Sequence, residues 1–357
     1  MSDSVFTIFN VVRIFTVATV AFFVTLLITP LWTKILYKYK LGKGVVREAS
    51  APIFSELHKK KVGIPTMGGV VIWVTVIVLT VGFWLLSKFY IGTSIGNINF
   101  LSRGQTWVPF TALIVAALVG LLDDFLGVLR IGPGGGGLRM RDRLIMYALV
   151  GAGGAWWFYT KLGWDFINVP FIGDWTVGWT YIPFFIFIIM ASAFSANETD
   201  GLDGLVAGVF LTMFGAYAVI AFDQGRMDLV VFLSAIMGSL VAFLWFNIYP
   251  ARFFMGDTGS MSLGVTLGVV AMLTNTPLLL IPIAAIFIME SGSVLIQLTS
   301  KRFRGKKIFL STPIHHHFEA LGWPETQVTM RFWTISAVGA IIGLIIFLVD
   351  SKIPPLF

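Results

Sequence analysis

The chain has 357 residues, of which 57% are hydrophobic and 12% are charged. A soluble domain carries about 25% charged residues because its surface faces water, so the composition excludes an ordinary soluble enzyme and indicates that lipid surrounds the chain. The absence of cysteine excludes disulfide scaffolds, thiolate zinc sites and cysteine nucleophiles. The net charge of +7 gains meaning only when the charges are assigned to sides of a membrane.

Ten apolar blocks approach the length of about 20 residues that a helix needs to cross a bilayer. They do not alternate as the strands of a lipid-facing barrel do. The sequence therefore predicts an all-α, polytopic membrane protein with one membrane-embedded domain over residues 1–357. The eighth block is the shortest. The blocks cover residues 14–36, 68–87, 107–122, 144–160, 179–195, 205–222, 229–247, 260–273, 278–299 and 332–349.

Basic residues are unevenly distributed between the connections. Nineteen of the 25 Lys and Arg residues lie in odd-numbered connections. Because cytoplasmic loops carry the excess of positive charge, we expect these connections in the cytoplasm and both termini in the periplasm. The basic run Lys301–Lys307 is interpreted as a topology signal in contact with anionic membrane lipids. Nucleic-acid binding is not expected.

Five aspartates gather at the cytoplasmic ends of the blocks: Asp123, Asp124, Asp200, Asp203 and Asp257. Two carboxylates about 4 Å apart repel by roughly 4 kcal/mol at an effective dielectric near 20. Such a cluster must protonate, pair with cations or bind a metal, and oxygen ligands favour Mg²⁺ or Mn²⁺ over Zn²⁺. The alternative is that each aspartate caps a helix or forms an ion pair.

Helix geometry limits the roles of these carboxylates. Asp123 and Asp124 would point about 100° apart on a helix, so we expect only one of them to aim at the reacting group. Asp200 and Asp203 are expected to share a helix face. Small residues beside Asp257 and the N–H groups of the following helix predict a seat for a diphosphate.

His315, His316 and His317 are consecutive, and adjacent side chains cannot all bind one ion. The run is interpreted as hydrogen bonding or charge toward an anionic substrate, with a solvated loop as the alternative. Glu290 is the one carboxylate inside an apolar block. Burying its charge at mid-bilayer costs about 2.5–3.5 kcal/mol, so we expect it to face other helices, with Ser291 and Ser293 as hydrogen-bond donors.

Six short motifs follow one another along the predicted cytoplasmic connections. They are Pro65–Gly69, Asp123–Asp124, Asn197–Gly204, Trp245–Asn247, Phe254–Ser260 and Pro313–Glu319. As an ordered set over nearly the whole chain, they resemble the family of phospho-N-acetylmuramoyl-pentapeptide transferases, also called translocase I. The first and last motifs resemble this family more than its relatives that transfer N-acetylhexosamine phosphate to polyprenyl phosphate.

The resemblance implies a ten-helix enzyme of the bacterial inner membrane with its active site on the cytoplasmic face. The implied reaction moves phospho-MurNAc-pentapeptide from UDP-MurNAc-pentapeptide to undecaprenyl phosphate, giving lipid I and UMP. The resemblance also implies Mg²⁺, with Mn²⁺ as an alternative, bound by Asp257, and a lipid phosphate bound or activated by Asp123 and Asp124. A homodimer is an open alternative to a monomer.

The resemblance further implies a set of substrate-binding residues, with Phe254 stacking on uracil and His315 and His316 contacting the sugar-nucleotide side. The set comprises Lys61, Thr66, Asn197, Asp200, Asp203, Asn247, Phe254, Gln297, His315, His316 and His317.

Two positions depart from the family pattern: Gly127 replaces a common lysine, and Glu198 replaces the usual leucine. Lys61, Arg141 and Arg143 lie on the face where basic side chains would neutralise the phosphates, and we expect Arg130 or Arg141 to replace the missing lysine. Two rival functions are a hexosamine-phosphate transferase and a secondary transporter or lipid flippase. Transporters place their sites near the midplane, whereas Glu290 alone lies within an apolar block here, which favours an enzyme.

Overall fold

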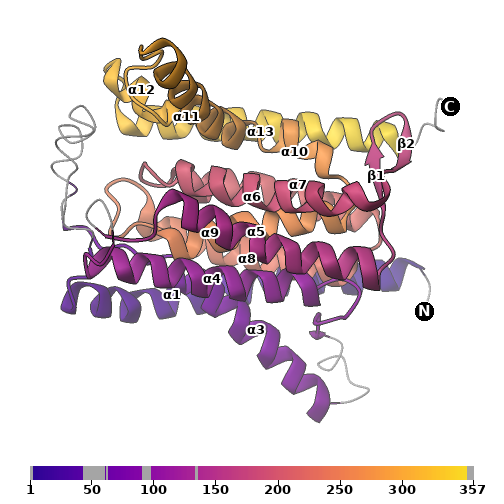
Figure 1. The fold of residues 1–357 in the computed structure, drawn as a ribbon. Helices are drawn as coiled ribbons and strands as arrows, with labels where there is room; N and C mark the ends of the chain where they lie inside the picture. The colour runs from indigo at the N-terminus through magenta and orange to yellow at the C-terminus, as the bar shows by residue number, and fades with distance from the viewer. Residues whose placement is uncertain (1–2, 43–60, 62, 91–97, 133–135, 352–357) are drawn as a thin grey trace.

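The computed structural model describes residues 3–42, 61, 63–90, 98–132 and 136–351, and within them it is almost entirely helical, as predicted (Figure 1). Three short helical turns cover Trp157–Lys161, Gly178–Thr180 and Pro277–Leu279. The longer helices are α1 (Asp3–Lys38), α3 (Val70–Phe89), α4 (Trp107–Val128), α5 (Met140–Trp156), α6 (Tyr181–Thr199), α7 (Leu205–Asp223), α8 (Met227–Asn247), α9 (Asp257–Leu273), α10 (Leu280–Ile283), α11 (Ala285–Arg304), α12 (Ile314–Ala320) and α13 (Glu325–Asp350).

Each of the ten apolar blocks coincides with helix, and the ninth differs from expectation because it is not one straight helix. The segments Pro277–Ile283 and Ala285–Arg304 meet at 85°. Within the described residues, seven helices are long and apolar enough to cross a membrane, and the bent pair gives an eighth. The chain is therefore a multi-pass membrane protein. Because α5 and α9 have 17 residues each, the count of ten crossings stays a prediction, as does the location of the termini.

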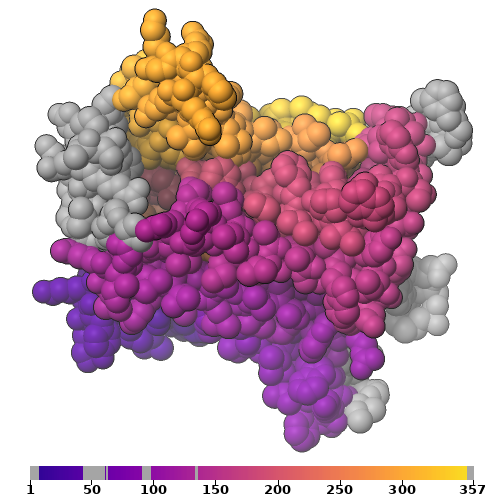
Figure 2. Space-filling view, viewed as in Figure 1, coloured from indigo at the N-terminus to yellow at the C-terminus, as the bar shows by residue number. Residues whose placement is uncertain are grey.

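The only strands among the described residues form a small hairpin. Strand β1 (Phe166–Val169) pairs antiparallel with β2 (Gly173–Thr176), so that Phe166 lies opposite Thr176. This hairpin lies at the end of the bundle where α1 begins and α13 ends (Figure 1). The opposite end carries α12, and there α4, α6 and α8 end while α7 and α9 begin. In the space-filling view, α3 and the region around the end of α11 project from the bundle (Figure 2).

Helix α9 is the centre of the bundle, because all 17 of its residues are buried. It packs against α4 and α6. Gly120 of α4 permits this contact at the start of α9, since a Cβ at this position would lie 2.4 Å from the carbonyl oxygen of Asp257. Backbone atoms cannot move aside as flexible side chains do, so a hydrogen is needed here. The close approach places the end of α4 beside Asp257.

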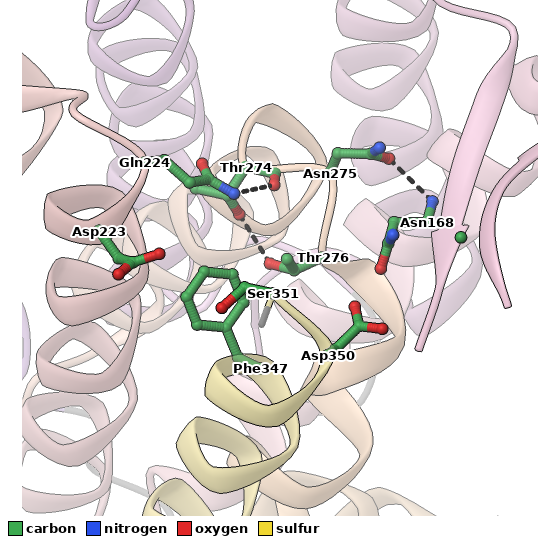
Figure 3. A pocket seen from close by; sticks show the side chains of 10 residues that line it. Asn168, Asp223, Gln224, Thr274, Asn275, Thr276, Phe347, Asp350 and Ser351 are labelled. Carbon is green, nitrogen blue, oxygen red and sulfur yellow. Dashed lines mark hydrogen bonds between the residues drawn. The ribbon is translucent and has the colours of Figure 1, made fainter. Parts of the chain in front are cut away.

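A cavity of about 320 Å³ opens at the end of the bundle where the hairpin lies. Asn168, Asp223, Asn275 and Asp350 contribute to its lining (Figure 3). It lies beyond the last residue of α9, and a helix of 17 residues is roughly 25 Å long. The cavity is therefore separate from the predicted cytoplasmic site, which lies at the first residue of α9.

Replacing Gly120 by alanine should disrupt the contact between α4 and α9. A methyl group forced against backbone costs about 1–3 kcal/mol, so we expect a lower midpoint of thermal unfolding in detergent. Gly82 of α3 is the matched control, because a Cβ there meets no atom within 4 Å. Equal midpoints for Gly120→Ala and Gly82→Ala would contradict the described packing.

Candidate active site

The aspartates predicted from the sequence converge on the backbone that begins α9. Asp124 Oδ2 accepts the N–H of Thr258 at 3.0 Å, and its Oδ1 accepts the hydroxyl of Thr66 at 3.1 Å. Asp200 Oδ2 accepts the N–H of Gly256 at 2.8 Å. These bonds bring two carboxylates from distant segments to either side of Asp257, the first residue of α9. A local concentration of negative charge results.

Glycine is required at position 256, between the converging carboxylates, because the φ of 76° there lies in the region that favours glycine. A Cβ there would also lie 2.5 Å from Thr66 Oγ1 and 2.6 Å from Asp124 Oδ2. Two of the N–H groups that were expected to bind a diphosphate are those of Gly256 and Thr258. Both already donate to carboxylates of the protein.

Arg143 of α5 is the cation inside this cluster. Its Nε lies 2.6 Å from Asp123 Oδ2, and its Nη2 lies 3.6 Å from Asp257 Oδ2. The guanidinium also donates to Asn197 Oδ1 at 3.2 Å, and the Asn197 amide in turn donates to Asp257. Asp123 Oδ1 accepts the N–H of Leu138 at 2.6 Å. Arg143 therefore neutralises part of the charge on two helices at once.

The predicted divergence of the aspartate pair is confirmed, since Asp123 faces Arg143 whereas Asp124 faces the start of α9. The expected source of positive charge is different from the observed one. The Arg141 side chain is 78% exposed and lies 3.5 Å from Asp142, and Arg130 is exposed. Arg143 faces the bundle because it lies two residues later on α5, and residues two apart on a helix point about 200° apart.

The prediction that Asp200 and Asp203 share a helix face is wrong. Helix α6 ends at Thr199, and the two aspartates lie in the turn before α7, where Gly204 has a φ of 74°. Asp203 instead binds the ammonium of Lys61 at 2.7 Å and accepts the N–H of Ala251 at 2.9 Å. The two carboxylates therefore serve different parts of the site.

A second group of predicted residues forms around Lys61. Its Nζ pairs with Asp203 and Glu325 and lies 5.6 Å from the centre of the Phe254 ring. Asn247 lies beside them, where it accepts the N–H of Gly204 at 3.1 Å and donates to the carbonyl of Phe253 at 2.8 Å. Phe254 is half-buried. Only two residues separate it from Asp257, so the two groups form one continuous site.

The three histidines have different partners, as expected for consecutive residues. His315 Nδ1 lies 2.9 Å from Glu290 Oε2, His316 Nδ1 lies 2.7 Å from Glu319, and His317 accepts the N–H of Leu310 at 3.2 Å. Burial lowers the pKa of His316 well below its usual range. A neutral ring that donates through Nδ1 keeps Nε2 as an acceptor.

Glu290 is fully buried among the helices, which confirms that it faces the protein. The expected donors are wrong, because the carboxylate of Glu290 contacts the ring of His315. Ser291 donates to the carbonyl of Phe287 and Ser293 to the carbonyl of Glu290 itself. Gln297, a predicted substrate residue, has its amide bonded to backbone groups of Ile308 and Phe309.

The donor set fits a hard divalent cation in its chemistry. The atoms at the start of α9 that could bind a cation are carboxylate, amide and hydroxyl oxygens, and Mg²⁺ prefers oxygen. Across the described ranges, no group of three or more His, Asp or Glu residues could hold a metal by itself. Mg²⁺ needs no such cage, because it is usually bound by one or two carboxylates together with substrate phosphates and water.

Comparison with known proteins places the chain in a family. Residues 106–275 match the family model described as glycosyl transferase family 4. Curated proteins named phospho-N-acetylmuramoyl-pentapeptide-transferase are similar over most of their length. The protein of Geobacillus thermodenitrificans is 36% identical over 92% of this chain and 95% of its own, and that of Listeria welshimeri is 37% identical over 91% and 95%.

The chain belongs to the phospho-N-acetylmuramoyl-pentapeptide-transferase family. This membership confirms the resemblance drawn from the six motifs, and it supports a phospho-sugar transferase over a transporter. Two departures from the family pattern can now be located. Gly127 lies in the last turn of α4, and Glu198 is half-buried in the last turn of α6 beside Asn197.

Two residues of the site were not in the predicted set of catalytic and substrate-binding residues, although Arg143 was expected among the basic side chains on the same face. Arg143 carried a detectable signal, since it is one of three arginines around the start of α5, but sequence could not show which of them turns inward. No feature of the sequence marked Glu325 as a residue of the site. It follows Pro324 at the start of an apolar helix, where an acidic residue is common for its effect on the helix dipole alone.

Replacing Arg143 by glutamine should leave Asp123 and Asp257 without their shared cation. Removing one member of a buried ion pair costs about 3–5 kcal/mol, and because the Arg143 side chain is 19% exposed we expect about half of this. Thermal unfolding in detergent measures the loss. Arg141→Gln is the matched control and should unfold at the wild-type temperature; a similar loss in both variants would show that Arg143 is not the cluster's cation.

Proposed function

We propose that this protein transfers phospho-MurNAc-pentapeptide from UDP-MurNAc-pentapeptide to undecaprenyl phosphate, forming lipid I and releasing UMP. Family membership supports a sugar nucleotide and a polyprenyl phosphate as substrates. The observation that carries the proposal is the continuity of the site. A charged cluster around Asp257 adjoins an aromatic ring and a lysine at Phe254 and Lys61, which suits a diphosphate joined to a nucleoside.

In the proposed reaction an oxygen of the lipid phosphate attacks the phosphorus attached to the sugar. A new P–O bond forms, the bond to the bridging oxygen breaks, and UMP leaves with the electron pair. Several negative charges meet in this step, so catalysis depends mainly on positioning and electrostatic stabilisation. Mg²⁺ bound with Asp257 would neutralise charge on the diphosphate and on the leaving group.

The side chains of this protein have distinct parts in the proposal. Arg143, between Asp123 and Asp257, supplies a guanidinium suited to phosphate oxygens. Asp123 or Asp124 binds or activates the lipid phosphate. Phe254 stacks on the uracil ring, while Lys61 and Asn247 border it. Asp200, His315 and His316 lie on the sugar-nucleotide side of the site, with Thr66 behind Asp124.

The location of the site suits a substrate that is a membrane lipid. The phosphate of a polyprenyl phosphate resides at the headgroup boundary, so only the nucleotide has to arrive from water. The candidate site lies at one end of the bundle, where α4 ends and α9 begins (Figure 1). We propose that this end faces the cytoplasm of the bacterial inner membrane, in agreement with the distribution of basic residues.

Incubation of purified protein with radiolabelled UDP-MurNAc-pentapeptide, undecaprenyl phosphate and Mg²⁺ tests the reaction. We expect butanol-soluble label and free UMP. If butanol-soluble label appears with UDP-N-acetylhexosamine and not with the muramoyl nucleotide, the hexosamine-phosphate transferase is favoured instead.

Asp257→Asn should reduce UMP release by about 100-fold or more because a charge that acts on the diphosphate is lost. Mg²⁺ should raise the unfolding temperature of the wild type by mass action and leave that of Asp257→Asn unchanged. Asp350→Asn, at the far end of the bundle, is the matched control. Near-normal turnover in Asp257→Asn would remove this residue from the metal site.

Single cysteines test the orientation, because the chain has none of its own. Trp175 belongs to β2 and Lys307 lies between α11 and α12, and both are exposed. The hairpin and α12 lie at opposite ends of the bundle (Figure 1). We expect an impermeant maleimide to label Trp175→Cys in intact cells, and Lys307→Cys only after the membrane is opened. The reverse pattern would place the site outside the cell.

A further inference from the structure

Glu325 joins three segments of the site that are far apart in sequence. It is the first residue of α13, and its Oε1 accepts the N–H of Asp203 at 2.7 Å. The same oxygen contacts the ammonium of Lys61. One carboxylate from the last helix therefore binds both the turn between α6 and α7 and the lysine that precedes α3.

The ordinary role of a glutamate in the first turn of a helix is to stabilise that helix through its free N–H groups and dipole. The hydrogen bonds of Glu325 point elsewhere. The N–H groups of Gln327 and Val328 donate to the carbonyl of Pro324, while the carboxylate reaches Asp203 and Lys61. Its contacts are thus those of a bridge between segments.

Lys61 depends on this bridge for its position. A lysine side chain has four rotatable bonds and takes a defined place only when its ammonium is held. Asp203 and Glu325 hold it from two elements, and the three side chains are 13%, 2% and 12% exposed for Lys61, Asp203 and Glu325. The held ammonium lies 5.6 Å from the centre of the Phe254 ring.

Asp203 has support that does not involve Lys61 or Glu325. Its Oδ2 accepts the N–H of Ala251, and its carbonyl accepts the hydroxyl of Thr329 at 3.3 Å. Loss of the Glu325 charge therefore leaves Asp203 in place and removes one of the two anions that fix the ammonium. The expected consequence is a Lys61 that moves relative to Phe254 within an intact fold.

We propose that Glu325 is a positioning residue for the nucleoside half of the sugar nucleotide, acting through Lys61. This inference rests on the proposed function. Because the bridge holds the ammonium of Lys61 beside the ring of Phe254, in the nucleoside half of the proposed site, the substrate affected is the nucleotide. The KM for UDP-MurNAc-pentapeptide depends on Glu325, whereas kcat and the KM for undecaprenyl phosphate do not.

Glu325→Gln tests the proposal because it removes the charge and keeps the shape. A charge-assisted hydrogen bond to a buried ammonium corresponds to about tenfold in binding, so we expect the KM for the nucleotide to rise about tenfold at wild-type kcat. Glu325→Asp keeps the charge and should recover part of the loss. An unchanged nucleotide KM in Glu325→Gln, or an equal rise in the KM for both substrates, would overturn the proposal.

Asp228→Asn is the matched control, since it breaks another largely buried ion pair, with Arg13 at 2.8 Å. Asp228 lies in the first turn of α8, about 30 Å along that helix from Asn247. We expect this variant to unfold at a lower temperature with an unchanged KM for the nucleotide. A rise in that KM here would show that lost stability alone accounts for the effect.

A double-mutant cycle with Lys61→Met separates action through Lys61 from a direct effect. If Glu325 acts through Lys61, adding Glu325→Gln to Lys61→Met changes the KM little further; additive effects would contradict the proposed route. Turnover by the wild type distinguishes a failure of the proposed function from a failure of the proposed role of Glu325. Absence of labelled lipid from the wild type would contradict the proposed function itself, whereas active wild type with additive variants contradicts only the role of Glu325.

Discussion

The structure depends on how negative charge is compensated at one end of an apolar bundle. Asp123 and Asp124 of α4, Asp200 of the turn before α7 and Asp257 of α9 meet where water is scarce, so each must have a partner. Backbone N–H groups serve Asp123, Asp124 and Asp200, and the guanidinium of Arg143 serves Asp123 and Asp257. The close approach of α4 to α9 follows from this arrangement, because the carboxylate of Asp124 must reach the N–H of Thr258.

The same end of the bundle combines two kinds of recognition. The charged cluster suits phosphate, and the ring of Phe254 with the ammonium of Lys61 suits a base. The short run from Phe254 to Asp257 connects them in sequence. Helix α13 enters this arrangement from the other end of the chain through Glu325. The site is therefore assembled from nearly the whole sequence, although its polar residues are few.

Much of the fold could be predicted because apolar length is a local property, and each of the ten blocks is helical. The 85° bend at Ala284 could not, since the apolar run continues through it. The gathering of aspartates was predicted from their positions at block ends, but their partners depend on packing. Helix spacing suggested one face for Asp200 and Asp203, whereas the glycines at 201 and 204 permit a turn that separates them. The inward direction of Arg143 likewise depends on how α5 is rotated in the bundle.

The complete burial of α9 bears on how the protein is assembled during synthesis. A helix of 17 residues with no lipid-facing side and a carboxylate at its first position gains little from the bilayer alone. Its stabilising contacts are with α4 and α6, which the ribosome makes earlier. Insertion of α9 is therefore coupled to association with helices already in the membrane, so partition into lipid and helix packing are not separate stages for this segment.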